Sequence, residues 1–405
     1  MTMQTWLGGI IVAWLLVQAV LLVAYRQALA ARWREPVLRY PVVIFESDDW
    51  GAGPLDQENS LKNLREILVR FNDRVARTPV VTLGVILATA DTQRIRNSGG
   101  AEYFSANLTE PVYAPLRDVM NGGVGQNVFA LHLHGMEHYW PPALMRAAAK
   151  DTSVRDWLQC DGIPGTEILP SALQARWTDA SELPSRALAG ATVRAAVAEE
   201  AGVFLACFNM RPRVAVATTF VWTEEVEAAW ATEGIDVIIT PGVRYTCRDA
   251  AGKPGGVDKH MLNGESSNSR QIYLVRDVYF EPSLGHTPER LVSDVKDRAM
   301  LGRPCLVEMH RFNFIGAADK CDASVRVLEA ALEKLQRTFP EVRFMTSLEL
   351  ADAMRTRTPA LLETKLTPRI RIWLRRIEQI SGFAKLAKIS GFAMPLRMIG
   401  KVVGT

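Results

Sequence analysis

Three of the chain's six histidines fall in one short stretch, ALHLHGMEHYWPP, at positions 130–142 of 405. His134 and His138 stand four positions apart. On one helical turn that spacing brings both imidazoles to the same side, where they can share a metal ion. His132 lies on the same strand face as His134, so it could join the metal site or support it. The stretch predicts a metal site built on imidazoles.

The letters HGMEH also fit H-x-x-E-H, the signature of inverted zinc proteases, in which Glu137 would be the general base. That motif requires a continuous helix. Here a strand-like run leads into His134, and Pro141 and Pro142 follow His138 closely, which leaves room for about one helical turn. An H-x-x-E-H zinc protease is therefore the less favoured alternative.

A second polar cluster, IFESDDWG at 44–51, also ends an apolar run. Asp48 and Asp49 are adjacent, so in a strand their carboxylates would point to different sides of the backbone. One could then ligate a cation while the other moves protons. Glu46 shares a strand face with Asp48 and could tune it or line the pocket. A polar loop with an N-capping aspartate would show the same letters, so the pair alone is weak evidence.

Short runs rich in β-branched and aromatic residues recur along the chain and predict buried strands. Helical patterns lie between several of them, at 60–75, 223–234, 287–302 and 323–339. This alternation predicts an α/β fold with a largely parallel sheet, open or closed as a barrel. The predicted strands are 40–45, 80–88, 127–134, 213–220, 235–240, 271–280, 304–310 and 342–347.

Three polar clusters stand at the carboxyl ends of these predicted strands, at 46–49, 132–138 and 310–313. In parallel α/β folds the chemistry gathers at that edge of the sheet. The clusters are therefore predicted to belong to one site.

Together these residues resemble the polysaccharide deacetylase family, the NodB-homology domains of carbohydrate esterase family 4. The family's first motif, an Asp-Asp pair, is matched by Asp48 and Asp49. Its second, two histidines four positions apart, is matched by His134 and His138. Its late strand-end histidine is matched by His310 in CLVEMHRFNF. The resemblance is to a divergent branch, covers roughly residues 40–351, and implies a distorted parallel (β/α) barrel of the NodB-homology type.

The resemblance also implies roles. Asp49, His134 and His138 would be the metal ligands. Asp48 would be the general base and His310 the general acid. One carboxylate and two neutral imidazoles would hold a divalent ion, with Zn²⁺ favoured, and leave positions open for water and the amide carbonyl. His310 would give a proton to the departing amine.

Two supporting roles stay open. The family pairs its catalytic aspartate with an arginine, and Arg213 stands in MRPRVAVATTF, a faint echo of the family's Arg-x-Pro-aromatic motif; Arg211 and Arg276 are alternatives. Asp277 could orient His310 through the ring nitrogen away from the substrate, and a surface ion pair is the alternative for Asp277. The sequence also departs from the family at Gly135, where Ser or Thr is usual.

The stretch WLGGIIVAWLLVQAVLLVAY, at 6–25, is uncharged and long enough to cross about 30 Å of hydrocarbon. We interpret it as a membrane anchor. Ala28-Leu29-Ala30 resembles a signal-peptide cleavage site, but the apolar stretch is too long and no basic region precedes it. Arginines follow the stretch at once, and five scattered cysteines show no CxxC pair. We therefore expect a single-pass protein of the bacterial inner-membrane type, with the catalytic domain on the cytoplasmic side.

The end of the chain is strongly basic: residues 365–405 hold nine Lys or Arg and one Glu, whereas the whole chain carries only +3. Apolar residues repeat there at helical spacing, and ISGFA occurs at both Ile380 and Ile389. Such a basic amphipathic tail lies naturally on an anionic membrane surface, and packing on its own domain is the alternative. The predicted organisation is a membrane anchor at 1–38, a catalytic domain at 39–355 and a membrane-surface tail at 356–405.

The sequence thus predicts a metal-dependent deacetylase that hydrolyses the amide of an N-acylated amino sugar, on a membrane-proximal or lipid-linked saccharide, and not a peptide bond. An alternative of another class is a non-catalytic glycan-binding or scaffold protein, although a pure binder has no use for Asp48 beside a metal ligand. Hydrolysis of a non-sugar amide also stays open. No phosphate loop, dinucleotide fingerprint or nucleic-acid motif appears in the sequence, so the basic tail is assigned to lipid and not to nucleic acid.

Overall fold

The computed structural model describes residues 3–404 and is built around one curled parallel sheet. Its order is β12-β9-β8-β5-β2-β1-β14-β13, with β15 beside β1, and the pairings within it are parallel. The strands are β1 (Val42–Gly51), β2 (Val81–Ile86), β5 (Phe129–Gly135), β8 (Val214–Val216), β9 (Val237–Thr240), β12 (Ile272–Val275), β13 (Val278–Tyr279), β14 (Cys305–His310) and β15 (Arg343–Phe344).

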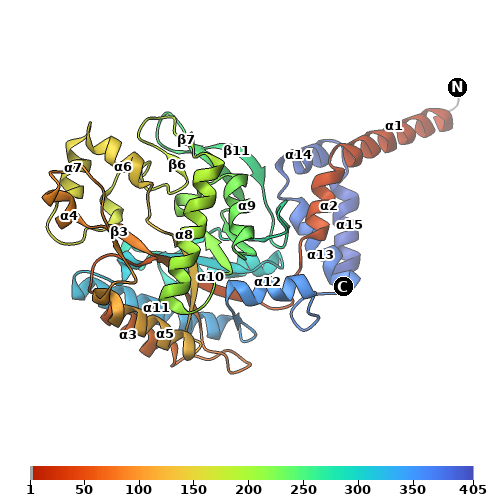
Figure 1. Ribbon diagram of the computed structural model, residues 1–405. Coiled ribbons are helices and arrows are strands. Elements are labelled where there is room, and N and C mark those ends of the chain that lie inside the picture. Colours follow the sequence, from red (N-terminus) through yellow and green to blue (C-terminus); the bar gives the residue numbers. More distant parts are fainter. Residues whose placement is uncertain (1–2, 405) are drawn as a thin grey trace.

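Helices pack around this sheet, and the sheet curls into a distorted, partly open (β/α) barrel (Figure 1). The predicted fold class is confirmed. The ten residues of β1 are all buried, as expected for a central strand of a parallel sheet with both faces covered. The surrounding helices are α3 (Gln57–Leu68), α5 (Ala114–Gly125), α8 (Gly190–Phe208), α9 (Glu224–Thr232), α10 (Pro288–Met300), α11 (Ala318–Thr338) and α12 (Ser347–Thr356).

Three excursions leave the carboxyl ends of β2, β5 and β9 and enlarge that edge of the sheet. They carry the two-stranded pairs β3 (Ala88–Ala90) with β4 (Ser105–Asn107), β6 (Thr178–Asp179) with β7 (Arg186–Ala187), and β10 (Val243–Arg248) with β11 (Pro254–His260), and the helices α4 (Thr92–Asn97), α6 (Pro141–Ala148) and α7 (Thr152–Leu158).

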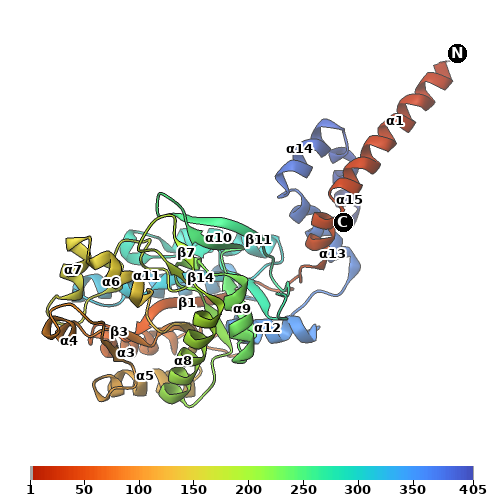
Figure 2. The ribbon, with the colours of Figure 1, turned by 45° about the horizontal axis from the view of Figure 1, so that its top comes forward.

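The two ends of the chain meet in a separate group of helices, which we call the helical base. It consists of α1 (Met3–Ala24), α2 (Arg26–Arg34), α13 (Leu366–Ile377), α14 (Ser381–Ile389) and α15 (Ala393–Gly404). Trp14 Nε1 of α1 donates to the Ser390 carbonyl at 2.7 Å, and Gln18 Nε2 donates to the same oxygen at 3.1 Å. Figure 2 shows α14 and α15 beside the lower part of α1.

The predicted tail is therefore three short helices, of which α13 packs on α2, α14 packs on α1, and α15 packs on α13 and α14. Each ISGFA repeat lies at a helix boundary, the first where α14 begins and the second between α14 and α15. Among the described residues, Trp6–Ala24 is the one helical stretch long and apolar enough to cross a membrane, and 11% of it is buried. Length and composition of this kind are also found in signal sequences.

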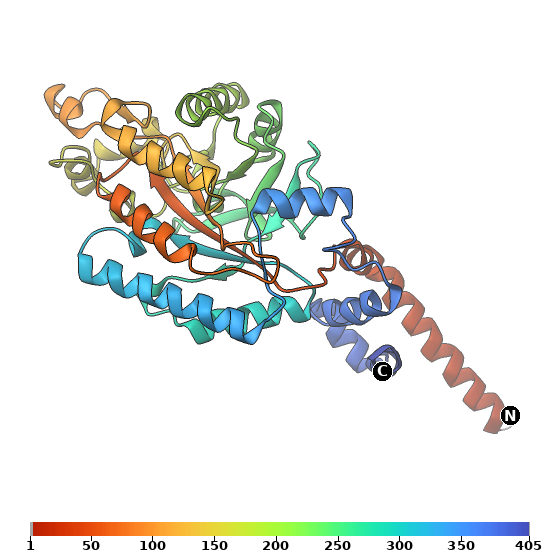
Figure 3. The same cartoon turned by 90° about the horizontal axis from the view of Figure 1, so that it is seen from below.

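The helical base joins the barrel at the amino ends of the strands. Arg376 of α13 is buried and donates to the carbonyls of Glu35, Pro36 and Leu301, which lie in the segments leading into β1 and β14. In Figures 1 and 3, α1 and the sheet extend in opposite directions from α13. The carboxyl edge of the sheet thus faces away from the helical base.

Candidate active site

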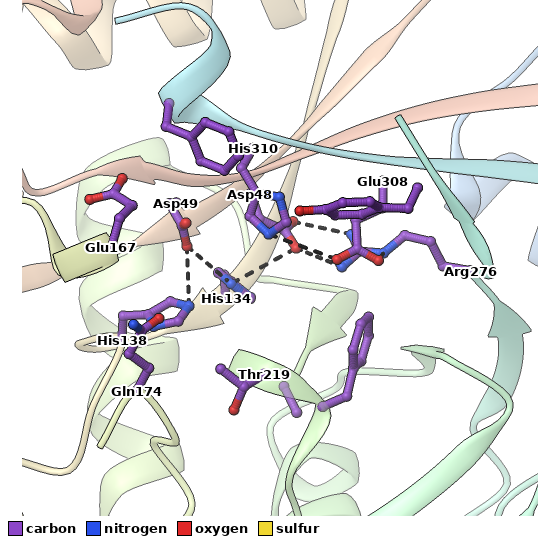
Figure 4. A pocket seen from close by; sticks show the side chains of 14 residues that line it. Asp48, Asp49, His134, His138, Glu167, Gln174, Thr219, Arg276, Glu308 and His310 are labelled. Atoms are coloured by element: carbon purple, nitrogen blue, oxygen red, sulfur yellow. Dashed lines mark hydrogen bonds and ion pairs between the residues drawn. The ribbon is translucent and has the colours of Figure 1, made fainter. Parts of the chain in front are cut away.

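A pocket of about 250 Å³ opens at the carboxyl edge, where β1, β5 and β14 end (Figure 4). All three polar clusters predicted from the sequence contribute to it. The lining side chains are Asp48, Asp49, His134, His138, Glu167, Gln174, Thr219, Phe220, Arg276, Tyr279, Glu308, His310 and Phe312, together with Ala217.

The two aspartates reach the same pocket because β1 is irregular at its end. Its register with β2 shifts between Ser47 and Trp50, and Asp49 has a φ of 73°, in the left-handed region. The expectation that the neighbouring carboxylates point to different sides of the backbone is therefore wrong. The bulge turns both toward one pocket, and backbone strain of this kind is typical of functional sites.

Gly84 of β2 makes room for Asp48. A Cβ at position 84 would lie 2.4 Å from Asp48 Oδ1 and 3.2 Å from Asp48 Cα. No side chain larger than hydrogen fits between the two strands there, so the glycine is required by close approach rather than by a turn.

The two histidines are brought together by a loop, and the predicted helical turn is absent. His134 ends β5, Gly135 follows with a φ of 122°, and His138 lies in the bend before α6. This positive φ is one that glycine adopts readily and other residues rarely do. His134 Nδ1 donates to the Val216 carbonyl at 3.0 Å, which leaves its Nε2 lone pair directed at the pocket.

Asp49, His134 and His138 form a candidate metal site. Their ligand atoms lie within 4.8 Å of one another. Asp49 Oδ1 is 3.4 Å from His134 Nε2 and 3.2 Å from His138 Nε2, yet this buried oxygen has no hydrogen-bond donor. One carboxylate and two imidazoles can hold a divalent ion and leave coordination positions open, and the ion would satisfy the unpaired Asp49 oxygen. Zn²⁺ suits this ligand set.

Glu137 does not take part in this site, which contradicts the H-x-x-E-H protease alternative. Its carboxylate forms an ion pair with the buried Arg176 and accepts from Tyr103 Oη at 3.4 Å, on the other side of the loop. The H-x-x-E-H motif also needs a helix, and the segment 134–138 has none.

Arg276, and not Arg213, pairs with Asp48. The buried Arg276 guanidinium donates to both carboxylate oxygens of Asp48, at 2.6 and 3.2 Å. Arg213 precedes β8 at the opposite edge of the sheet, where it pairs with Asp236 at 2.7 Å. Arg211 also lies there, 3.8 Å from Glu233. The prediction of Arg213 is corrected to Arg276, one of the open alternatives.

Glu281, and not Asp277, orients His310. His310 Nδ1 donates to Glu281 Oε1 at 2.5 Å, and Glu281 is fully buried. Asp277 instead forms an ion pair with Arg298 at 3.0 Å, as its surface-pair alternative proposed. Glu281 was missed, although it follows directly on the apolar run 271–280, at a predicted strand end.

Charges around the pocket set the protonation states of the acid and the base. Burial alone would raise the pKa of Asp48, but the Arg276 guanidinium and the His134 ring outweigh it and hold the pKa at about 2. Burial alone would lower the pKa of His310, but the hydrogen bond to Glu281 and the charge of Asp49 raise it to about 10. Asp48 is thus ionised and His310 protonated at neutral pH.

Behind Asp48 lies a second layer of polar side chains. Glu46 is buried below the pocket rather than lining it, accepts from Arg276 at 3.2 Å and bonds to Ser347. His132 Nδ1 is 3.7 Å from Glu46, so His132 supports this layer and lies outside the candidate ligand set. Glu308, which the sequence did not single out, lines the pocket 3.4 Å from Arg276 Nε.

No protein-family model and no curated protein matches this sequence. Solved structures resemble it over most of its length. They include a wild-type CE4-family pseudoenzyme of Bacillus anthracis (11% identity, 78% of this chain and 66% of that chain, TM-score 0.36) and a peptidoglycan deacetylase of Bacillus subtilis (10%, 80% and 95%, 0.36). A third is the CE4 domain of a multidomain xylanase from the hindgut metagenome of Trinervitermes trinervoides (10%, 78% and 91%, 0.35).

The chain resembles CE4 deacetylases and pseudoenzymes in fold. Sequence identities of 10–11% show a similar fold and do not show a shared activity. The similar structures include both deacetylases and a pseudoenzyme. Chemistry has to be inferred from the side chains of the pocket.

Proposed function

We propose that this protein is a metal-dependent amide hydrolase that deacylates an N-acylated amino sugar. One observation carries the proposal. The candidate ligands Asp49, His134 and His138 share one pocket with an ionised Asp48 and a protonated His310, which stand opposite each other at the ends of β1 and β14. A binding site needs no such pair, whereas amide hydrolysis needs both a base and an acid.

A divalent ion held by these three residues would lower the pKa of a bound water and polarise the amide carbonyl. Asp48 is placed to accept a proton from the attacking water, since Arg276 keeps it ionised and fixed. The carbon–nitrogen bond then breaks as His310 Nε2 gives its proton to the departing nitrogen. Glu281 holds the other ring nitrogen, so Nε2 is the one that faces the pocket. The products are a carboxylic acid and a free amine.

The walls of the pocket support a saccharide as the carrier of the amide. Phe312 stacks on His310 with ring centroids 5.5 Å apart, and Tyr279 meets His310 edge-on at 6.1 Å. Both line the pocket, and Tyr279 is exposed. Aromatic rings beside carboxylates suit the apolar faces and hydroxyls of a sugar.

The proposal extends to the membrane. Trp6–Ala24 would anchor the protein as a single-pass span, with the barrel on the cytoplasmic side, and the basic helices α13–α15 would meet lipid. A membrane-proximal or lipid-linked saccharide is then the favoured substrate. A reporter fused to the C-terminus tests the side: a cytoplasmic-type signal is expected, and an external signal would reverse this part of the proposal.

The test of the chemistry uses the full-length protein in neutral detergent with an N-acetylglucosamine oligomer as the probe. Wild type should contain about one zinc ion per chain and release acetate. Asp48→Asn should keep the metal and lose at least about 100-fold in turnover. Asp49→Ala should lose the metal as well. Saccharide binding without acetate release in both wild type and Asp48→Asn would establish a glycan-binding protein instead.

A further inference from the structure

A second cavity, of about 450 Å³, lies at the opposite end of the molecule from the pocket described above. The carboxyl end of α2, the end of α12 and the segment leading into α13 form its walls. Its lining includes three arginines: Arg34 at the end of α2, Arg357 at the end of α12 and Arg369 in the first turn of α13. Trp33 and Leu362 contribute apolar wall. We refer to it as the basic cleft.

The positive charge of the basic cleft is largely unpaired. Within the described residues, the guanidinium groups of Arg34 and Arg357 have neither a hydrogen bond nor an ion pair. A nearby exposed arginine differs in this respect, since Arg355, in the last turn of α12, pairs with Asp352 at 2.6 Å. Glu363 is the single carboxylate among the lining residues, so the cleft keeps an excess of positive charge.

The third arginine is held in place without being neutralised. Arg369 Nη2 donates to the Trp33 carbonyl at 2.9 Å, and its guanidinium lies over the Trp33 ring at 5.0 Å. Helix α13 begins at Leu366, beside the cleft, and its Lys365 N-cap has no side-chain cap, so the amino end of this 12-residue helix adds partial positive charge. A pre-oriented guanidinium and two unpaired ones in one cavity are suited to a phosphate group.

The position of the cleft indicates the source of that phosphate. Helix α2 follows the candidate span α1 after Tyr25 and ends at Arg34, so its nine residues cover about 14 Å. The cleft therefore lies within one short helix of the end of the span. That is the distance at which headgroups and juxtamembrane basic residues meet.

The neighbouring helices independently indicate a lipid surface. Leu386 and Ile389 of α14 and Met394 and Met398 of α15 are exposed. From Ser381 to Gly404 the chain has basic residues and no acidic one. The junction between these helices is bonded to Trp14 and Gln18, inside the candidate span. An exposed apolar face with basic residues, fixed to a membrane span, is suited to an anionic bilayer.

We infer that the basic cleft binds the phosphate of an anionic lipid headgroup and thereby fixes the orientation of the barrel on the bilayer. The cleft is separated from the pocket by the length of the sheet. The inference therefore does not depend on the deacylase proposal, and binding can be measured without turnover.

The test measures binding of short-chain phosphatidylglycerol, below its micellar concentration, to the full-length protein in neutral detergent. Phosphatidylglycerol should raise the midpoint of thermal unfolding of wild type. In Arg34→Gln/Arg357→Gln the affinity should fall about tenfold or more. The charge-matched control Arg39→Gln/Arg355→Gln, which changes two exposed arginines outside the cleft, should bind like wild type.

Three results would overturn the inference. Equal affinity of the cleft variant and wild type would show that these arginines bind nothing. Equal affinity for phosphatidylcholine would show that anionic headgroups are not recognised. Equal affinity for inorganic phosphate would assign the cleft to a free anion and not to a lipid. An unchanged midpoint of the unliganded variant controls for folding, because the exposed side chains of Arg34 and Arg357 make no hydrogen bond or ion pair within the described residues.

Discussion

At the scale of single residues, the pocket separates an acid from a base by giving each a buried partner of opposite charge. Arg276 holds Asp48 ionised, and Glu281 holds His310 protonated. Each partner acts through the residue that it touches, so Arg276 and Glu281 are positioning residues. Pairs of titratable groups whose environments push their pKa values apart mark acid and base roles.

The first prediction concerns Glu281→Gln. The amide keeps a hydrogen bond to His310 but removes the negative charge, so the pKa of His310 should fall from about 10. A general acid works only while protonated, and activity is therefore lost as pH rises through its pKa. The alkaline limb of kcat/KM should move to lower pH in Glu281→Gln.

Asp277→Asn is the matched control, because Asp277 pairs with Arg298 away from the pocket. Its alkaline limb should coincide with that of wild type. A shift in Asp277→Asn with none in Glu281→Gln would mean that the orientation of His310 has been assigned to the wrong carboxylate.

The sequence can predict that a residue stands at a strand end, but not which residue of another strand it meets there. Asp48, Asp49, His134 and His310 stand at or just past the end of an apolar run, so their place at a strand end can be predicted. Arg276 and Glu281 reach Asp48 and His310 across the sheet, and that contact depends on the strand order, which places β13 beside β14. Arg213 stands before β8, so it lies at the amino edge, where it cannot meet Asp48.

At the scale of elements, strand β2 leaves room for the proposed general base, Asp48, because its residue 84 is a glycine. Gly84→Ala should displace Asp48, since Arg276 holds that carboxylate and the new Cβ would lie 2.4 Å from Oδ1. We expect a loss of about 1–3 kcal/mol in the free energy of unfolding and a clear fall in turnover. Gly202→Ala, in the middle of α8 with open space around it, should instead stabilise by about 0.5–1 kcal/mol. Wild-type turnover in Gly84→Ala would contradict the proposed placement of Asp48.

Helix α8 fixes the loop that carries His138, through a buried carboxylate. Glu200 accepts from the Met136 amide at 3.1 Å and from Trp230 Nε1 at 3.2 Å, and burial raises its pKa to about 7. Between the ordinary pKa of a glutamate and about 7, Glu200 is therefore protonated in the folded chain and ionised in the unfolded chain. The stability linked to that proton is present at low pH and is lost as pH rises through about 7.

Glu200→Gln keeps one of the two acceptor oxygens and should lose the hydrogen bond to either Met136 or Trp230 at every pH. Its stability relative to wild type should nevertheless be higher at pH 8 than at pH 5, because glutamine does not ionise. Unfolding midpoints of both proteins across this range measure the difference. A difference independent of pH would mean that Glu200 is ionised throughout in the folded chain.

Helix α8 also shows what the sequence pattern does not reveal. It was not predicted, because its apolar and polar residues do not separate into a buried and an exposed face. Glu200 is buried, whereas Ala195 and Ala198 are exposed. The strands were predictable, because they are buried on both faces and appear as continuous apolar runs. Contacts with distant residues, such as those of Glu200 with Met136 and Trp230, determine which residues of α8 are buried. A local stretch of sequence does not show such contacts.

At the scale of the whole molecule, the sheet separates the sites of the two proposed functions. The helical base and the basic cleft lie at the amino ends of the strands, and the pocket lies at the carboxyl ends. From Val42 to Asp49, β1 covers roughly 20 Å or more. A saccharide linked to lipid would have to present its amide several sugar units from the bilayer to reach the pocket.

This separation gives the last prediction. Turnover of a soluble N-acetylated oligosaccharide should be the same in neutral detergent and in anionic nanodiscs, and the cleft variant Arg34→Gln/Arg357→Gln should match wild type on it. Among lipid-linked saccharides, those that carry the acetamide on the sugar next to the lipid should be poor substrates, and those that carry it further out should be good ones. Faster turnover of the lipid-proximal acetamide would require the barrel to tilt its carboxyl edge toward the bilayer, which contradicts the fixed attachment of the helical base through Arg376.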